Sequence, residues 1–171
     1  MAEKTRRDFI LLASTAMAVA GAGFVLWPFI ASMSPSADVI SKRLLYVNIT
    51  GIKVGESKRV IWETTPVYIR HLTADELTLA QSVPMSDLFD PQSATARVKS
   101  GRESWVVVLG ICTYVGCIVQ PGGEFGGWLC HCCGAQYDAL GRVRSRYPAK
   151  KNLAIPPYRF DSDGEIVIGT G

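Results

Sequence analysis

The sequence predicts a mainly β fold, in which an N-terminal transmembrane helix is followed by an antiparallel β head carrying a small subdomain of two loops. Three observations predict it. An apolar run lies near the N-terminus, short runs of β-branched and aromatic residues follow, and all five cysteines fall in two short loops. Many short strands with frequent glycines and one short helix are typical of antiparallel β folds.

The first element expected is a membrane anchor at residues 9–30. This most apolar stretch is 22 residues long and follows a basic segment, residues 1–8. About 20 apolar residues span a bilayer as a helix, whereas the apolar region of a cleaved signal has about 7–15. The length therefore favours a retained anchor ending near Pro28, with the basic segment cytoplasmic. Cleavage after Ala18-Val19-Ala20 is the alternative.

Two further features surround this anchor. Thr5-Arg6-Arg7-Asp8-Phe9-Ile10 matches a twin-arginine export signal, a route that carries folded proteins. Small and polar residues with one proline make residues 31–41 a linker of moderate stiffness, either a hinge or a simple spacer.

The head is expected to span residues 42–171. Strand-forming runs occupy residues 44–49, 59–62, 66–70, 105–109 and 164–168. The capping-box pattern Thr73-Ala74-Asp75-Glu76 predicts a short helix that runs toward Gln81. A polar connection follows at residues 87–102. The net charge of +3, with 19% charged residues, gives no indication of a nucleic-acid partner.

The two cysteine loops, residues 110–118 and 128–138, are the most informative part of the head. The first contains Cys112-Thr113-Tyr114-Val115-Gly116-Cys117, and the second contains Cys130-His131-Cys132-Cys133-Gly134-Ala135. Five sulfurs and a histidine in glycine-marked loops are poor material for a hydrophobic core. They suit a metal cluster, a disulfide, or both.

These loops resemble the cluster-binding loops of Rieske iron–sulfur proteins, C-T-H-L-G-C and C-P-C-H-G-S. The likeness extends over nearly the whole chain and is to the Rieske subunit of bacterial quinol:cytochrome c oxidoreductases. Its flanking matches are Gly110-Ile111, Gly126-Gly127-Trp128, Gln136-Tyr137-Asp138 and Gly141-Arg142. The resemblance implies one [2Fe–2S] cluster, electron transfer from quinol to a c-type cytochrome, and a cytochrome b subunit as partner. It also implies a single-pass protein of the bacterial inner membrane with its head in the periplasm.

The resemblance assigns a role to each matching residue. Cys112 and Cys130 stand at the cysteine-ligand positions of one iron. Cys117 and Cys132 match the pair that forms a disulfide between the loops, which needs an oxidising compartment. Tyr137 matches a hydroxyl donor that tunes the cluster potential.

The chain departs from the family at the second iron, which two histidines normally bind. Tyr114 and Cys133 occupy the two histidine positions, and His131 replaces the proline between the cysteines. A phenol ionises near pKa ~10 and binds iron only as an anion. A thiolate adds negative charge, and neither group titrates near neutral pH as histidine does. Taken literally, the loops predict a cluster that is low in potential, unstable or absent.

Several interpretations of these departures remain open. One is an ordinary Rieske subunit with errors in the recorded sequence. A second is a degenerate paralogue with an altered cluster, in which His131 or Cys117 joins Cys112, Cys130 and Cys133 as a ligand. Such a paralogue with an altered or absent cluster would act as a structural or assembly subunit. A third is a zinc site or a metal-free scaffold. A related alternative is the small Rieske subunit of another exported oxidoreductase, such as an arsenite oxidase.

Other conspicuous residues are expected to be structural. His71, which follows a strand, is expected at the surface or in a capping position, and Trp105 and Trp128 are expected in the core. A solvated basic face is expected from Arg142, Arg144, Arg146, Lys150 and Lys151.

Overall fold

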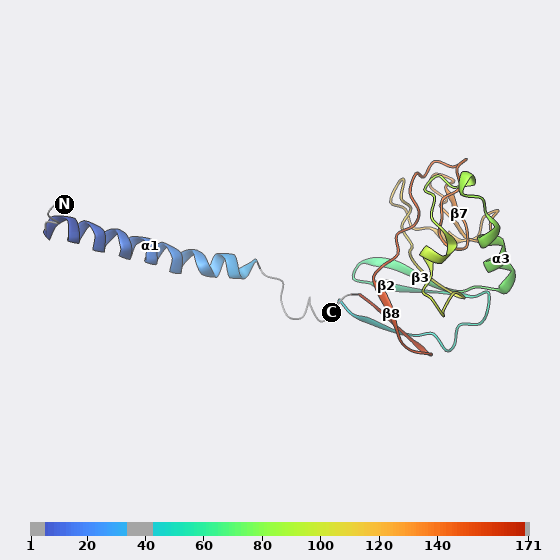
Figure 1. Cartoon of the computed structure of the whole chain (residues 1–171), viewed down its shortest axis with the longest axis horizontal. Helices are drawn as coiled ribbons and strands as arrows, with labels where there is room; N and C mark the ends of the chain where they lie inside the picture. The colour runs from blue at the N-terminus through green and yellow to red at the C-terminus, as the bar shows by residue number, and fades with distance from the viewer. Residues whose placement is uncertain (1–5, 34–42, 170–171) are drawn as a thin grey trace. The chain divides into compact units, whose positions relative to one another are not determined.

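The computed structural model describes residues 6–33 and 43–169 of the 171-residue chain. Residues 34–41 of the predicted linker lie outside the described residues, and its predicted start at residue 31 is wrong, because residues 31 and 32 are helical. The chain forms two compact units, residues 1–41 and 42–171. Figure 1 shows the long N-terminal helix and the β head, and each unit is described by itself below.

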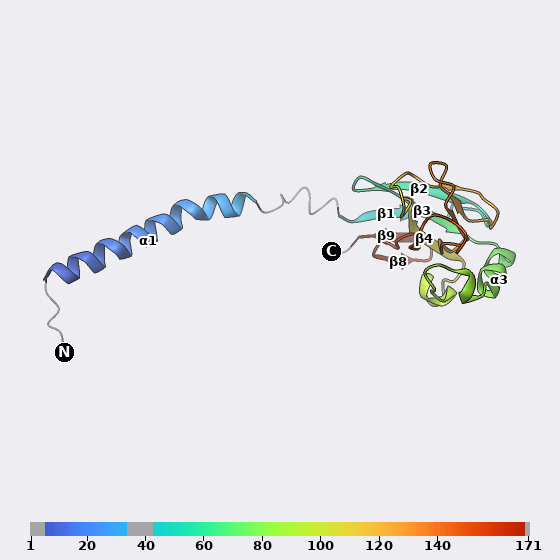
Figure 2. The same cartoon turned by 90° about the horizontal axis from the view of Figure 1, so that it is seen from above.

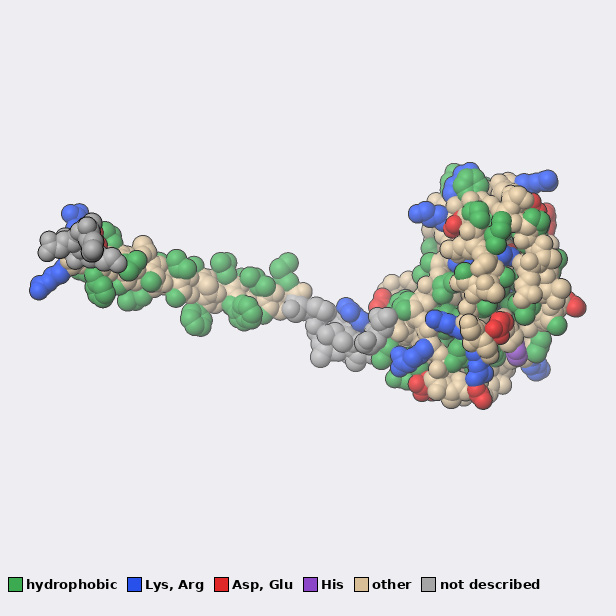
Figure 3. Space-filling model, in the orientation of Figure 1, with side chains coloured by type: hydrophobic (Ala, Val, Ile, Leu, Met, Phe, Trp, Pro, Cys, Tyr) green, Lys and Arg blue, Asp and Glu red, His purple; other side chains and the backbone are tan. Residues whose placement is uncertain are grey.

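Helix α1 (Arg6–Ser32) is 27 residues long and has no buried residue. At 1.5 Å per residue it measures about 40 Å, enough to cross a hydrocarbon core of about 30 Å. Apolar side chains line it in Figure 3. Its hydroxyl groups are satisfied internally, because Ser14 and Thr15 donate to the Leu11 carbonyl at 3.0 and 2.9 Å. These two hydroxyl groups thus have partners without water.

The expectation that Pro28 ends this helix is wrong, since the helix continues to Ser32. Proline removes only one backbone donor, and the helix has a single turn left to complete beyond it.

The head contains three antiparallel sheets of three strands each. Two of them have the orders β1-β9-β8 and β2-β3-β4, and the third, smaller sheet has the order β5-β6-β7. Figure 1 shows β7 at the opposite end of the head from β2 and β8, and Figure 2 shows β2 and β8 on opposite sides of the head. The bounds are β1 (Leu45–Asn48), β2 (Ser57–Trp62), β3 (Thr65–His71), β4 (Trp105–Leu109), β5 (Gln120–Pro121), β6 (Trp128–Leu129), β7 (Gln136–Tyr137), β8 (Tyr158–Ser162) and β9 (Glu165–Ile168).

These sheets confirm the predicted antiparallel β class, with differences in detail. The predicted strands at 44–49, 59–62, 66–70, 105–109 and 164–168 correspond to β1, β2, β3, β4 and β9. Strand β8 and the two-residue strands β5, β6 and β7 were not predicted. Their sequences are too short or too polar to give a periodic signal, so tertiary pairing creates them.

The one helix predicted in the head is confirmed. Helix α3 (Ala74–Ser82) begins after Thr73, whose hydroxyl accepts from the Glu76 N–H at 3.1 Å. The Glu76 carboxylate accepts in turn from the Thr73 N–H at 3.0 Å, completing the capping box. Glu76 also pairs with Arg70 of β3, which fixes this helix to the sheet.

Two apolar clusters fill the head. One packs the two larger sheets together around Val67, Ile69, Val107 and Ile166. The other supports the cysteine loops and is centred on Trp128, which is fully buried against Tyr68 with ring centroids 4.7 Å apart. Trp105 is also buried, so both tryptophans are core residues as expected.

The expectation of a solvated basic face is wrong for Arg142. Its side chain is 1% exposed, and its Nε donates to the Asp138 carboxylate at 2.7 Å. Its remaining donors reach the backbone carbonyls of Ala80 and Gln92. A buried guanidinium needs such a complete set of partners. Arg142 therefore ties the segment after the second loop to helix α3 and to the polar connection.

The polar connection of residues 87–102 is also more structured than its composition indicates. It begins at the last residue of the short 3₁₀ helix η1 (Met85–Asp87) and contains a second, η2 (Ala94–Arg97). Arg97 is buried and donates to the Leu140 and Leu153 carbonyls at 3.1 and 2.6 Å. Burial lowers the pKa of Arg97 to about 10, although Asp138 and Asp90 oppose the shift.

Candidate metal centre

The first cysteine loop, residues 110–118, is a tight turn at the end of β4. The Cys112 N–H donates to the Cys117 carbonyl at 2.8 Å, and the Gly116 N–H donates to the Cys112 carbonyl at 2.9 Å. Gly116 has a φ of 73°, a conformation that glycine adopts without steric cost. The loop therefore closes on itself and places its leading cysteine at a fixed position.

The second loop, residues 128–138, has the same backbone pattern. The Cys130 N–H donates to the Ala135 carbonyl at 2.9 Å, and the Gly134 N–H donates to the Cys130 carbonyl at 2.8 Å. Gly134 has a φ of 71°. The two loops are thus equivalent turns, in which each leading cysteine is followed by its glycine four residues later.

The head holds both turns rigidly against its second apolar cluster. The Tyr68 hydroxyl donates to the Val119 carbonyl at 2.8 Å just after the first loop. Gly127 packs so closely on the chain after the second loop that a Cβ there would lie 2.2 Å from the Asp138 backbone. Only glycine fits this position, which explains the glycine immediately before Trp128.

A disulfide between Cys117 and Cys132 joins the two loops, with their Cα atoms 6.5 Å apart. This is the pairing that the resemblance implies. The remaining three cysteines, Cys112, Cys130 and Cys133, are free thiols.

These three thiols converge on one point between the loops. Their sulfurs all lie within 4.8 Å of one another, and Sγ of Cys112 is 3.7 Å from Sγ of Cys133. Cys112 and Cys130 are buried, whereas Cys133 is half-buried. The sequence pattern had marked all three residues, and the fold brings them together.

Tyr137 is positioned to influence this group. Its hydroxyl lies 3.5 Å from Sγ of Cys112 and accepts from the Thr113 N–H at 3.2 Å. The Thr113 hydroxyl donates to the Lys151 carbonyl at 2.6 Å, which anchors the first loop to a later segment. Sequence reasoning missed Thr113, whose only signal was its place beside a ligand cysteine.

The three groups differ in how readily they ionise. Burial disfavours the Cys112 thiolate, but hydrogen bonds from Tyr137 and from the Val115 and Tyr114 backbone outweigh burial and lower the Cys112 pKa to about 7. Burial, together with hydrogen bonds to Cys130 and Cys112, raises the Cys133 pKa to about 11. Burial and the neighbouring Cys112 thiolate also raise the pKa of Tyr137. In the metal-free site one thiol is therefore readily ionised and another is not.

The donor set does not fit a cluster bound by two cysteines and two histidines. Tyr114, at one histidine position, is 59% exposed, and Cys133 stands at the other. Among the described residues, neither His131 nor His71 belongs to a group of side chains that could share a metal. His131 is exposed. His71 ends strand β3, half-buried and stacked on Trp105 with ring centroids 4.1 Å apart.

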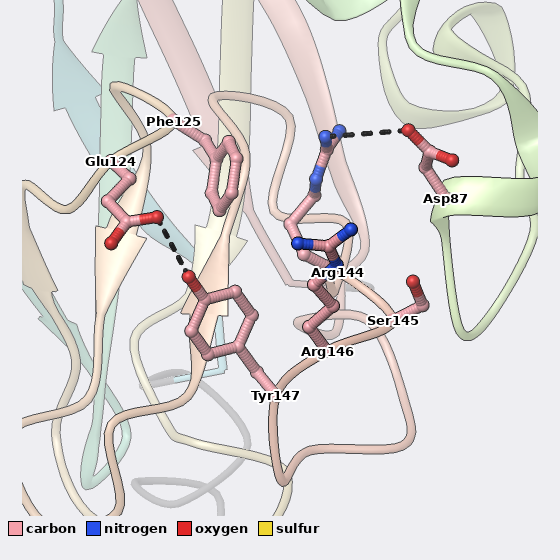
Figure 4. Close-up of a pocket in the computed structure, with 7 residues that line it drawn as sticks. All are labelled: Asp87, Glu124, Phe125, Arg144, Ser145, Arg146 and Tyr147. Atoms are coloured by element: carbon pink, nitrogen blue, oxygen red, sulfur yellow. Dashed lines mark hydrogen bonds and ion pairs between the residues drawn. The ribbon is translucent and has the colours of Figure 1, made fainter.

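A hollow of about 340 Å³ lies in another part of the head, shown in Figure 4. Its charged groups are largely paired, since Tyr147 donates to Glu124 at 2.9 Å and Arg144 lies 3.9 Å from Asp87. Its lining residues are Asp87, Glu124, Phe125, Arg144, Ser145, Arg146 and Tyr147. None of the predicted ligands lines this hollow, and it shares no residue with the group of three thiols.

Known proteins resemble the chain along nearly its whole length. The family model "Ubiquitinol-cytochrome C reductase Fe-S subunit TAT signal" matches residues 1–36. A ubiquinol-cytochrome c reductase iron-sulfur subunit of Rickettsia felis is 46% identical over 168 residues, covering 98% of this chain and 94% of the relative. The protein of the same name from Bradyrhizobium diazoefficiens is 46% identical over 167 residues, covering 96% and 94%.

The likeness reaches further relatives. The mitochondrial Rieske subunit of the cytochrome b-c1 complex from Saccharomyces cerevisiae is 44% identical over 162 residues, covering 94% of this chain and 74% of the relative. A solved chain of a hyperthermophilic respiratory Complex III superposes with a TM-score of 0.56 at 19% identity, covering 92% of this chain and 98% of that one. The last likeness concerns the fold alone.

Proposed function

Because this chain belongs to the family of ubiquinol–cytochrome c reductase iron–sulfur subunits, we propose that it serves in transferring electrons from quinol to a c-type cytochrome. A near-full-length identity of 46%, including the anchor as well as the head, carries this proposal. Its partners would be a cytochrome b subunit, a c-type cytochrome and quinol. The family implies an iron–sulfur centre between them.

The organisation of the chain supports this role. Residues 1–8 would remain cytoplasmic by the positive-inside rule, residues 9–30 would span the inner membrane, and residues 42–171 would lie in the periplasm. Residues 31–41 would act as a tether. The disulfide between Cys117 and Cys132 agrees with an oxidising compartment.

The cofactor proposed is one [2Fe–2S] cluster, and the chain has the family's ligands for only one of its two irons. Cys112 and Cys130 would bind one iron, and Tyr137 would donate a hydrogen bond beside it. The positions of Tyr114 and Cys133 would face the second iron without the usual histidines. When bound, such a cluster supplies one-electron chemistry. The residues of the chain itself hold the loops together and exclude water from the buried thiols.

The incomplete donor set favours a second candidate function. A head that keeps the anchor, the disulfide and both turns but lacks histidine donors can occupy its place in the complex as a structural subunit. It would then assemble with the partners without carrying electrons.

Purification of the tagged full-length chain from membranes of its own host tests both functions. We expect b-type and c-type cytochromes to co-purify, and membranes lacking the chain to lose quinol-dependent reduction of cytochrome c. Replacement of Arg6 and Arg7 by lysine, which impairs a twin-arginine signal while keeping the charge, is the matched control for export. Co-purification without an electron paramagnetic resonance signal from a reduced cluster would favour the structural role. Absence of both cytochromes would reject membership in the complex.

A further inference from the structure

We infer that the free thiols of Cys112, Cys130 and Cys133 form a binding site for a single thiophilic divalent cation of the Zn²⁺ class. The site would be filled in protein that has not received an iron–sulfur cluster. The inference rests on the donor set that this chain presents in place of two cysteines and two histidines, and it does not depend on the proposed function.

The distance between the sulfurs of Cys112 and Cys133 matches one shared ion. A tetrahedral Zn²⁺ binds thiolate sulfur at about 2.3 Å, which places two of its sulfurs about 3.8 Å apart. Sγ of Cys112 and Sγ of Cys133 are 3.7 Å apart, and all three sulfurs lie within 4.8 Å of one another. Two of the sulfurs are therefore already spaced for a shared ion, and the third lies close enough to join them after a small movement.

The backbone is also suited to such an ion. Cys130 and Cys133 have the C-x₂-C spacing common in structural zinc sites, and Cys112 comes from an equivalent turn on the facing loop. The disulfide between Cys117 and Cys132 braces these turns, so little ordering remains for the ion to induce. Preorganised ligands of this kind favour binding.

The fourth coordination position would be open. Cys133 is half-buried, whereas Cys112 and Cys130 are buried, so the ion would reach solvent on the Cys133 side. Three protein ligands with water in the fourth position form a known arrangement for Zn²⁺. Each coordinating thiol releases its proton on binding, leaving three Zn–S bonds and no change of oxidation state.

The neighbouring group of sulfurs cannot serve in the same way. Cys117, Cys130 and Cys132 also lie within 4.8 Å of one another, but Cys117 and Cys132 are consumed by the disulfide. The inferred ion and an iron–sulfur cluster would both need Cys112 and Cys130. The two occupants are therefore mutually exclusive.

The experiment uses the purified full-length chain in detergent, freed of metal by a chelator with its disulfide intact. Titration with Zn²⁺, and with Co²⁺ as a spectroscopic probe, should give one ion per chain. X-ray absorption of the zinc form should find three sulfur neighbours.

Cys133→Ser should leave two sulfurs and weaken zinc binding by roughly 100-fold or more, because loss of even an outer-shell partner costs about 10–100-fold. His131→Ala, at an exposed residue outside the group, is the matched control and should bind as the wild type does.

Circular dichroism of each variant separates loss of a ligand from loss of the fold. Binding that is unaffected by Cys133→Ser, or a zinc form with fewer than three sulfurs, would overturn the inference. So would equal zinc uptake by chains already loaded with a cluster, because the ion would then lie elsewhere. None of these outcomes depends on whether the chain assembles with cytochromes.

Discussion

The two cysteine loops have the same backbone conformation but differ in their side chains. Both leading cysteines donate to the carbonyl five residues later, and both turns close through a glycine of positive φ. At the third position after the leading cysteine, however, the first loop has exposed Val115 and the second has Cys133 within the thiol group. The comparison teaches that the turn fixes where a side chain points, while the residue placed there decides the chemistry.

The largest expected effect comes from restoring the family's donors in both loops. Tyr114→His together with Cys133→His would supply two neutral ligands in place of a phenol and a thiolate. In cluster-containing protein, the reduction potential should rise by several hundred millivolts, on the order of the gap between histidine-ligated and all-thiolate clusters. A redox titration followed by electron paramagnetic resonance measures it. An unchanged potential would show that these positions do not face the second iron.

A smaller effect tests whether the turns are equivalent. Gly116→Ala and Gly134→Ala should each destabilise the head by about 1 kcal/mol or more, because both residues have positive φ. No other part of the described chain lies within 4 Å of a Cβ at either position, so strain in the backbone alone sets the cost. Urea unfolding of the metal-free protein measures it.

The matched control for the glycine pair is Gly101→Ala. Gly101 has a φ of 75°, equally open surroundings, and a place outside both loops. All three variants should lose similar stability. A clearly larger loss for one loop glycine would contradict the equivalence of the turns.

The smallest expected effect concerns Tyr137 of the second loop, whose hydroxyl reaches Cys112 and Thr113 of the first loop. Tyr137→Phe removes a hydrogen bond to Cys112, so the Cys112 pKa should rise from about 7 toward its ordinary value of 9.0. Alkylation of this thiol in metal-free protein, followed by mass spectrometry against pH, should then shift to higher pH. Tyr158→Phe, at a buried tyrosine of the other apolar cluster, is the control.

The same shift links stability to pH. The Cys112 pKa in the fold lies below its ordinary value, so its ionisation stabilises the fold above about pH 9 and this contribution is lost as the pH falls through about 7. Tyr137→Phe should reduce this dependence in urea unfolding. An unaltered alkylation profile would mean that the hydroxyl does not stabilise the thiolate.

Local patterns made much of the fold predictable. The capping box at Thr73 specified helix α3, because the side chains of Thr73 and Glu76 accept from each other's backbone N–H groups. The apolar run at Trp105–Leu109 specified β4, which is buried at four of its five positions. The burial of Arg142 could not be foreseen, because its partners Ala80 and Gln92 come from distant segments.

The sequence by itself determined the class of fold, the apolar helix and the two turns, since glycine spacing and hydrophobic pattern act over a few residues. Only the tertiary structure decided that three thiols meet while Tyr114 and His131 remain exposed. The physical reason is distance along the chain. Cys112 and Cys133 come from two loops that the pairing of the two-residue strands β5, β6 and β7 brings together, with Trp128 of β6 buried in the core.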